Sequence, residues 1–512
     1  MWVVAVVAGL GAVLRAGPLV AYGTFSARPN YDDGVNFTAA ALLTEGLLPY
    51  RDYFYAHPPA GPLLLAPAAA LSRWVGADRA FALAGLGVVA LAAVTIFLLG
   101  RLCWKLWGPA AGVTAALFYA VHPEVIVAER TTFMEPALNL ACVVTATMWL
   151  GGTGKGPMDN RRALAAGVAG GVALTFKAWA LAWVLAALVS APREGRRAAL
   201  GRFGAGAGAA VAVVCLPFAV PALGTFVENT VFFHLWRPPD GTMSTATRVH
   251  EMLGFHPLNW RIPEGRHAAT SLFAVGGLAV ALVRARRPDH RGERLVAAAY
   301  VLTFAAFLAG RSYFTHYNAH LALADTALAG LLVGTAWRWL ARTRSRPWAP
   351  AALTSRAGTA AVLALVVAVP AWMSLQRALD DARSQSPELV TLGHHIRRLP
   401  AGECLLTFEP MWGLAGGRLP SVVEGAPIVL DPYGVMVFEA VRDGGRFGDL
   451  ASLYADPRSQ PTVRALLERC RFVILGGREV QFSEGTAAWF RENYRVRDTP
   501  GAPYDIWERA GP

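Results

Sequence analysis

The chain contains little charge and few cysteines for its length. Only 16% of its 512 residues are charged, whereas about 25% are charged in an average soluble protein. Its five cysteines form no CxxC pair and show no Cys/His spacing typical of a zinc site. No internal repeat is evident along the chain. These absences argue against an ordinary soluble enzyme, a zinc protein and a repeat protein.

Apolar residues take the place of the missing charge. They make up 54% of the chain, and the mean hydropathy is +0.38. They are concentrated in runs of about 20 residues, the length of helix that crosses about 30 Å of hydrocarbon. The sequence therefore predicts an all-α polytopic membrane protein with about eleven transmembrane helices. The expected spans lie near residues 1–23, 81–100, 108–121, 133–151, 163–176, 178–191, 203–222, 268–283, 295–310, 318–337 and 357–375.

The first expected span is interpreted as a retained helix and not as a cleaved signal peptide. It lacks a basic segment at its start, Arg15 interrupts it, and no small-residue cleavage site follows. A second interruption occurs at Lys177. The apolar stretch around this lysine forms either one long helix or two short ones.

The distribution of basic residues predicts the topology. Every second connection is short and basic: "RLCWK", "KGPMDNRR", "REGRRAALGR", "RARRPDHRGER" and "RWLARTRSR". Such loops lie in the cytoplasm by the positive-inside rule. The net charge of +12 is thus a membrane-topology signal, and no nucleic-acid partner is expected. The connections predicted to face outward are 24–80, 122–132, the turn at Lys177, 223–267 and 311–317.

The composition changes at about Gln376, and residues 376–512 are predicted to form a separate extracytoplasmic α/β domain after a transmembrane domain over 1–375. "ECLLTF" and "RFVILGG" are typical of short buried strands. "SPELVTLGHHIRRLP", "TVRALLERC" and "TAAWFRENY" are typical of helices beside them. A disulfide between Cys404 and Cys470 is left open, because spacing alone does not support it.

The first outward connection, 24–80, begins with two adjacent acids, Asp32 and Asp33. One interpretation is that they only cap the helix of "YDDGVNFTAAALLTEG", because Asp is a good N-cap residue. Against this stands the length of the loop, since connections this long are usually functional or disordered. Its aromatic and apolar content favours ordered amphipathic helices on the membrane surface over disorder.

Further ionisable residues occur in the other outward connections. "HPEVIVAERTTFMEP" supplies four, and "RSYFTHYNAH" supplies a further group between two spans. Snorkelling and helix capping explain some of them, but an unpaired acid just inside an apolar run is costly. Cations beside acids indicate an anionic ligand at the outer face. The residues concerned are Glu124, Glu129, Arg130 and Glu135 in the first segment, Arg311, His316, Tyr317 and His320 in the second, and Lys177.

These motifs, in this order, resemble the C-type glycosyltransferases, which include protein O-mannosyltransferases and lipid A aminoarabinose transferases. The resemblance covers about residues 1–340. It rests on the first-loop acids, on "GLLPYRDY" followed by His57-Pro58-Pro59, on Glu135 in "ERTTFMEP", and on the late "RSYFTHY". The sequence departs from the family pattern in two ways. The acid pair is Asp-Asp where Asp-Glu is commoner, and histidine stands where some relatives have lysine.

The resemblance implies a membrane enzyme that transfers a sugar from a polyprenyl-phosphate donor to a lipid, glycan or protein acceptor, with inversion. Asp32 is the expected catalytic base and Asp33 the second choice, and Glu135 is expected to orient the acceptor or the neighbours of Asp32. The resemblance requires no cofactor, although Asp32 and Glu135 could share a divalent metal. The residues expected at the donor phosphate are Arg51, His57, Lys177 and Arg311, and those expected at the substrates are Tyr55, Glu129, Arg130, His316 and Tyr317.

Two other classes of function compete with this reading. A transporter or flippase of lipid-linked sugars would show repeated halves and polar groups near the membrane midplane. A non-catalytic envelope assembly protein would use the C-terminal domain for binding and would not need the acid–cation cluster. The clustering of acids at one predicted interface favours the enzyme.

Overall fold

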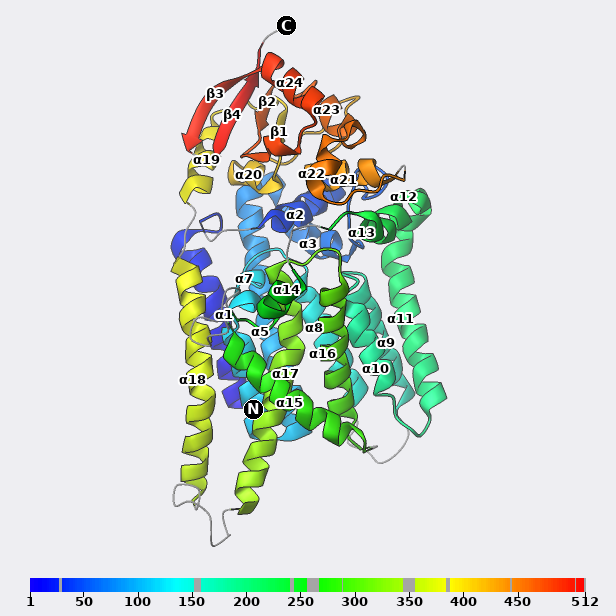
Figure 1. Ribbon diagram of the computed structural model, residues 1–512, viewed down its shortest axis with the longest axis vertical. Helices are drawn as coiled ribbons and strands as arrows, with labels where there is room; N and C mark the ends of the chain where they lie inside the picture. Colours follow the sequence, from blue (N-terminus) through cyan, green and yellow to red (C-terminus); the bar gives the residue numbers. More distant parts are fainter. Residues whose placement is uncertain are drawn as a thin grey trace.

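The computed structural model describes residues 1–26, 30–151, 158–239, 244–255, 267–287, 289–343, 355–383, 387–442, 444–501 and 503–510. Figure 1 shows a bundle of long helices with a small sheet-containing domain at one end, where the chain terminates. The bundle and this domain each have a hydrophobic core. The last helix of the bundle is α18 (Arg356–Arg383), and the domain division expected near residue 376 stays a prediction.

The apolar segments expected from the sequence all fold as helices of the bundle. Those before the midpoint are α1 (Trp2–Tyr22), α5 (Ala77–Trp107), α6 (Pro109–Val121), α8 (Glu135–Leu150), α9 (Asn160–Leu174), α10 (Ala180–Val189) and α11 (Arg196–Ala219). The later ones are α15 (Ala268–Ala285), α16 (Arg291–Ala309), α17 (Asn318–Thr343) and α18.

The chain is a multi-pass membrane protein by the length and composition of these helices. In the described part of the chain, seven helical segments are long and apolar enough to cross a membrane, and α6 and α10 are shorter apolar helices. The expected count of about eleven crossings therefore stays a prediction. The question left open at Lys177 is answered, because α9 ends at Leu174 and α10 begins at Ala180, with the lysine in the turn between them.

The connecting segments at the upper end of the bundle contain short helices. They are α2 (Tyr31–Thr44), α3 (Ala60–Ala70), α4 (Ser72–Val75), α7 (Pro123–Ala128), α12 (Leu223–Val227), α13 (Phe233–Trp236) and α14 (Thr245–Met252). The helices expected in the first loop are present, but α2 is not the amphipathic surface helix that the sequence predicts. All residues from Asp33 to Leu42 are buried. In Figure 1, α2 lies between the bundle and the C-terminal domain.

The C-terminal domain has a four-stranded sheet in the order β1-β2-β4-β3. Strands β1 (Leu405–Thr407) and β2 (Phe472–Ile474) are parallel, and β3 (Tyr494–Gly501) and β4 (Tyr504–Arg509) form an antiparallel hairpin beside β2. Cys404 and Cys470, which precede β1 and β2, form a disulfide. The helices are α19 (Pro387–Arg397), α20 (Pro410–Ala415), α21 (Pro432–Arg442), α22 (Leu450–Ala455), α23 (Pro461–Leu467) and α24 (Glu484–Asn493).

The C-terminal domain packs directly on the first loop. A Cβ atom on Gly34 of α2 would lie 2.7 Å from the backbone nitrogen of Met411 in α20, so only glycine permits this approach. The ring of Phe54 in the first loop lies 5.1 Å from Phe233 of α13 and 5.3 Å from Phe438 of α21, between ring centroids. Three segments far apart in the sequence thus share one apolar contact, which fixes the domain over the end of the bundle.

Cysteine labelling tests the predicted orientation. Val480 in the C-terminal domain is 79% exposed, and Glu194 lies exposed in one of the basic loops. We expect Val480→Cys to react with an impermeant maleimide in intact cells, and Glu194→Cys to react only after lysis. Background labelling is expected to be low because Cys103, Cys142 and Cys215 are buried. The opposite labelling pattern would contradict the orientation.

Candidate active site

The two adjacent acids at the start of α2 have different environments. Asn30 is the N-cap residue, and its backbone N–H donates to Asp33 Oδ2 at 2.6 Å in a capping box. The Asp33 side chain is fully buried, and the Thr132 hydroxyl donates to the Asp33 carbonyl at 2.9 Å. Burial raises the pKa of Asp33 to about 7, although the Asn30 N–H acts in the opposite direction. Asp33 therefore has a clear structural role.

Asp32 points to a different side of α2, because consecutive helical residues are rotated by about 100°. Its side chain is 38% exposed, and its Oδ2 lies 3.7 Å from Nε2 of His316. The His316 ring stacks on Phe133, with centroids 4.7 Å apart. Asp32 of the first loop therefore lies beside His316 of the segment between α16 and α17, as an accessible carboxylate beside an imidazole.

Beneath this pair lies a buried ion pair. Lys177 Nζ donates to Glu135 Oε1 at 2.6 Å, and the two side chains are 5% and 0% exposed. Glu135 is the first residue of α8, where the helix dipole favours negative charge. Lys177 Nζ also lies 5.2 Å from the ring centroid of Tyr317. Because the rings of Tyr317 and His316 are 4.8 Å apart, contacts run without a break from Glu135 to Asp32.

We call these five residues the Asp32 cluster: Asp32, His316, Tyr317, Lys177 and Glu135. They come from α2, the turn before α10, the start of α8 and the segment before α17. The cluster contains one accessible carboxylate, and its second carboxylate is already paired with a cation. It can accept a proton at Asp32 and can stabilise negative charge nearby through Lys177 and the His316 ring.

His57 lies beside this cluster together with two residues that the sequence reasoning missed. The His57 ring stacks on His234 with centroids 5.5 Å apart, and a His234 ring nitrogen lies 2.7 Å from the Ala56 carbonyl oxygen. Burial lowers the pKa of His57, and the charges of Lys177 and then of His234 and Arg237 lower it further. His57 is thus a neutral imidazole at pH 7 that sits in a positive field.

His234 and Arg237 follow the apolar span of α11, in the connection 223–267 that the sequence predicts to face outward. No motif marks them as functional. The sequence did place them in a connection on the same predicted side of the membrane as Asp32 and Asp33, and this position could have indicated a role in the site. A search for basic residues in every outward connection would have found them.

The C-terminal domain contributes a third missed residue, Asp431. The hydroxyl of Tyr31 donates to Asp431 Oδ1 at 2.6 Å, and the backbone N–H of Gly434 donates to the same oxygen at 2.7 Å. Burial raises the pKa of Asp431 to about 6, and the charge of Asp32 raises it as well. The domain therefore places an acid close enough to Asp32 to influence it. In the sequence, Asp431 precedes "PYG", a pattern that indicates only the start of a helix.

Several expected site residues lie outside the Asp32 cluster. Arg51 is half exposed and pairs with its neighbour Asp52 at 2.7 Å. Glu129 is fully buried and pairs with Arg15 of α1 at 2.7 Å, and its other oxygen accepts from Tyr119 at 2.7 Å. The interruption in the first span is therefore one half of a buried ion pair. This arrangement gives Glu129 a role in holding α1 against the bundle.

The remaining expected residues are placed as follows. The Tyr55 hydroxyl donates to Asn36 Oδ1 at 3.0 Å within the first loop. Arg130 and Glu124 are buried. His320 lies in the first turn of α17, where a ring nitrogen is 2.7 Å from Asn139 Oδ1. Arg311 is exposed and borders a pocket beneath the C-terminal domain. Within the described ranges, no group of three or more His, Cys, Asp or Glu side chains is arranged to hold a metal ion.

The fold and the loop arrangement define a class of protein: a polytopic helical membrane protein that carries its ionisable loop residues beneath a terminal α/β domain. This is the fold of the C-type glycosyltransferases, as the resemblance implied. No family model matches the sequence, and no curated protein matches it either. The fold assignment therefore rests on solved structures.

One similar structure is ArnT from Cupriavidus metallidurans bound to undecaprenyl phosphate, with a TM-score of 0.63, 14% identity, and coverage of 100% of this chain and 99% of that one. Another is the Archaeoglobus fulgidus oligosaccharyltransferase tethered to an acceptor peptide, with a TM-score of 0.60, 12% identity, and coverage of 99% and 74%. A third is AglB from Archaeoglobus fulgidus with an inhibitory peptide and a dolichol-phosphate, with a TM-score of 0.60, 10% identity, and coverage of 100% and 74%.

The raised pKa of Asp33 predicts how stability depends on pH. Its pKa is about 7 in the folded chain, above the ordinary 3.8, so the folded state binds more protons than the unfolded state between these values. We expect the free energy of unfolding to fall as the pH rises from about 4 to about 7. Asp33→Asn, whose amide oxygen can still accept from the Asn30 N–H, should reduce this slope in thermal unfolding of the purified protein. An identical slope in the parent and the variant would contradict this.

Proposed function

We propose that this chain is an integral membrane glycosyltransferase that transfers a sugar from a polyprenyl-phosphate donor to an extracytoplasmic acceptor. The observation that carries the proposal is the Asp32 cluster, in which an accessible carboxylate faces an imidazole above a buried acid–cation pair. A transporter reading gains no support from this arrangement, because its ionisable groups gather at one end of the bundle beneath the C-terminal domain.

The fold adds support for the donor class. The similar ArnT structure is described with undecaprenyl phosphate, and the similar AglB structure with a dolichol-phosphate. A lipid phosphate partitions to the membrane interface, where the loops of this chain meet the ends of its helices. The similar Archaeoglobus fulgidus oligosaccharyltransferase is tethered to an acceptor peptide, whereas here the acceptor class stays open between lipid, glycan and protein.

Asp32 is the proposed general base. Its carboxylate takes the proton of the acceptor hydroxyl or amine as that group attacks the anomeric carbon. A new bond forms at this carbon, and the bond from the carbon to the phosphate oxygen breaks on the opposite face. The lipid phosphate leaves with the electron pair. A single displacement of this kind inverts the configuration, by analogy with one-step glycoside chemistry.

Lys177, His57 and Arg237 are the proposed partners of the departing phosphate, since positive charge near a leaving group stabilises the transition state. Glu135 keeps Lys177 charged and in position through their ion pair. His57 contributes an N–H donor in its neutral form. Arg51 is a weaker candidate than these three, because its side chain is half exposed and pairs with its own neighbour Asp52. Glu129 is likewise a weaker candidate for substrate binding, since Arg15 holds it.

Paired substitutions in the two adjacent acids test the assignment of the base. Asp32→Asn should keep the fold and donor binding but lose turnover by roughly 10²–10⁴-fold, the range for loss of a general base. Asp33→Asn should cost much less, because the amide oxygen of asparagine can still accept from the Asn30 backbone N–H that closes the capping box. Initial rates against donor concentration for the purified variants measure both effects.

His57→Ala is the companion variant, and it should mainly weaken donor binding. Two outcomes would contradict the proposal. An active Asp32→Asn with an inactive Asp33→Asn would assign the base to the other acid. Full activity in both aspartate variants would mean that the two acids only cap α2. The main support for an enzyme would then be lost.

A further inference from the structure

The C-terminal domain carries a groove of about 970 Å³ on the side away from the bundle. In Figure 1 this is the top of the domain, where β3 begins and β4 leads to the C-terminus. The groove is formed by the segment before β2, the end of α24, the start of β3 and the end of β4. Its volume lies within the range of ligand sites. Its charged lining residues, which define what we call the arginine groove, are Arg469, Arg471, Arg495, Arg497, Arg509 and Glu508.

The arginine groove has an excess of positive charge, because five arginines and one glutamate line it. Glu508 pairs with Arg471 at 2.8 Å and with Arg497 at 2.7 Å. Arg471 also pairs with Glu403 at 3.0 Å. The other three arginines donate to backbone carbonyl oxygens: Arg469 to Glu424, Arg495 to Arg491, and Arg509 to Glu468. Since a carbonyl has no net charge, these contacts hold the three guanidinium groups without neutralising them.

Folding alone does not explain this crowding of positive charge. The backbone N–H of Arg509 donates to the carbonyl of Arg471 at 2.8 Å, so the two arginines are cross-strand neighbours. Like charges placed opposite each other destabilise a sheet. Arg495 and Arg497 add two further positive charges from the adjacent strand β3. An anion bound among these arginines would remove the repulsion between them.

Aromatic rings hold several of the arginines in place before any ligand binds. The guanidinium carbons of Arg471 and Arg497 each lie 5.2 Å from the ring centroid of Phe472. The guanidinium carbon of Arg509 lies 6.0 Å from the ring of Trp489. Such cation–π contacts are attractive. Side chains that are already positioned lose less conformational entropy on binding, which favours affinity.

The chemistry of the arginine groove indicates a ligand with several carboxylates. Glu508 shows that these guanidinium groups bind a carboxylate, the acid that arginine binds with parallel N–H donors. An acidic peptide would most readily add a strand beside β3, which is the edge strand of the sheet. The pairing register of β3 shifts on both sides of Asp498, and His395 of α19 is hydrogen-bonded to Asp498. A continuous added strand is thus disfavoured. An acidic glycan needs no backbone ladder and contacts several arginines along its length.

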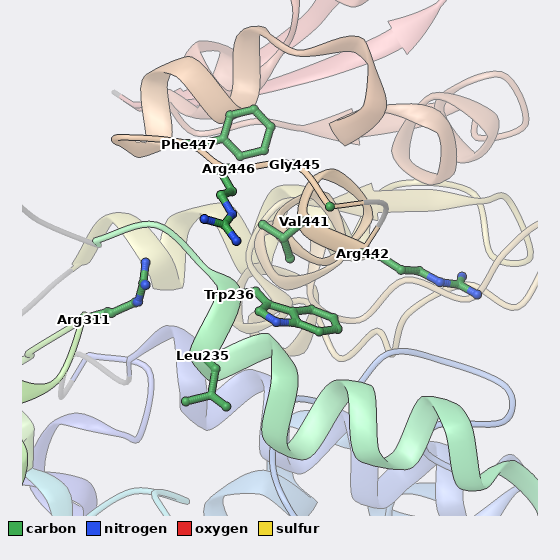
Figure 2. Close-up of a pocket in the computed structure, with 9 residues that line it drawn as sticks. Leu235, Trp236, Arg311, Val441, Arg442, Gly445, Arg446 and Phe447 are labelled. Atoms are coloured by element: carbon green, nitrogen blue, oxygen red, sulfur yellow. The ribbon is translucent and has the colours of Figure 1, made fainter.

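The position of the arginine groove argues against other anions. It lies away from the bundle (Figure 1), so the headgroups of the surrounding membrane do not reach it. The phosphate of a lipid-linked donor is expected at the opposite side of the domain. There the pocket of Figure 2 lies between Trp236 and Arg311 of the bundle and Arg446 of the C-terminal domain. Nucleic acid is not expected at a domain that the basic loops predict to face outward.

We propose that the arginine groove binds an acidic glycan, whose carboxylates pair with Arg495, Arg509 and the neighbouring arginines. Under the proposed function this glycan is the acceptor, which the C-terminal domain holds while one end of the glycan reaches the Asp32 cluster. The inference rests on the proposed function for the role of the glycan as acceptor, but not for its binding. It gives the C-terminal domain a part in selecting the acceptor, beyond the accessory role that its sequence indicates.

Equilibrium binding tests this proposal. The full chain is purified into nanodiscs of phosphatidylcholine, and calorimetry measures its Kd for an oligogalacturonate, for the uncharged methyl ester of this glycan and for an oligoglutamate of the same charge. The variants are Arg495→Gln and Arg509→Gln. Arg398→Gln is the matched control, because Arg398 is exposed on the same domain immediately after α19 and does not line the groove. Thermal unfolding checks that all variants fold.

We expect the parent to bind the oligogalacturonate more tightly than the oligoglutamate, more weakly as the salt concentration rises, and not to bind the ester. Each groove variant should bind the oligogalacturonate about tenfold more weakly, or worse, with the control unchanged. No binding by the parent, or equal affinities in all four proteins, would overturn the proposal. Equal binding of the oligoglutamate, lost in the same variants, would overturn it in favour of an acidic protein partner. Because no turnover is measured, a failure here is distinguishable from a failure of the proposed function.

Discussion

The arrangement of the site depends on the buried ion pair between Glu135 and Lys177. Neither charge could remain alone in the apolar bundle, and removal of one partner of such a pair typically costs about 3–5 kcal/mol. The pair joins the start of α8 to the turn between α9 and α10. Tyr317 packs on the lysine and His316 packs on Tyr317, so the position of the histidine beside Asp32 follows from this one interaction.

The C-terminal domain places a second constraint on the position of Asp32. The C-terminal domain approaches α2 so closely at Gly34 that a larger residue would collide with Met411. The Tyr31–Asp431 hydrogen bond holds the residue immediately before Asp32. The two acids of the first loop are thus held between a buried ion pair and a docked domain, which leaves one buried in a capping box and the other accessible. This difference in environment is the basis for the different roles that we propose for the two adjacent aspartates.

Local sequence patterns predicted the elements well and the contacts between them poorly. Hydrophobic runs of membrane length predicted each helix of the bundle, and short β-rich runs predicted β1 and β2, since burial alone determines such patterns. The hairpin of β3 and β4 was missed because its exposed, arginine-rich sequence lacks the apolar signal of a buried strand. Asp32 and Glu135 were proposed from motifs, whereas the Arg15–Glu129 pair and the place of Asp431 depend on tertiary contacts between distant segments.

Release of lipid phosphate tests the central claim most directly. The purified chain, in lipid, is incubated with a panel of polyprenyl-phosphate sugars and with candidate lipid, glycan and peptide acceptors, and free polyprenyl phosphate is measured over time. The account predicts that at least one donor releases polyprenyl phosphate in step with an acceptor glycosylated with inverted configuration. If the chain moved intact donors across the bilayer without breaking the sugar–phosphate bond, the glycosyltransferase account would be contradicted.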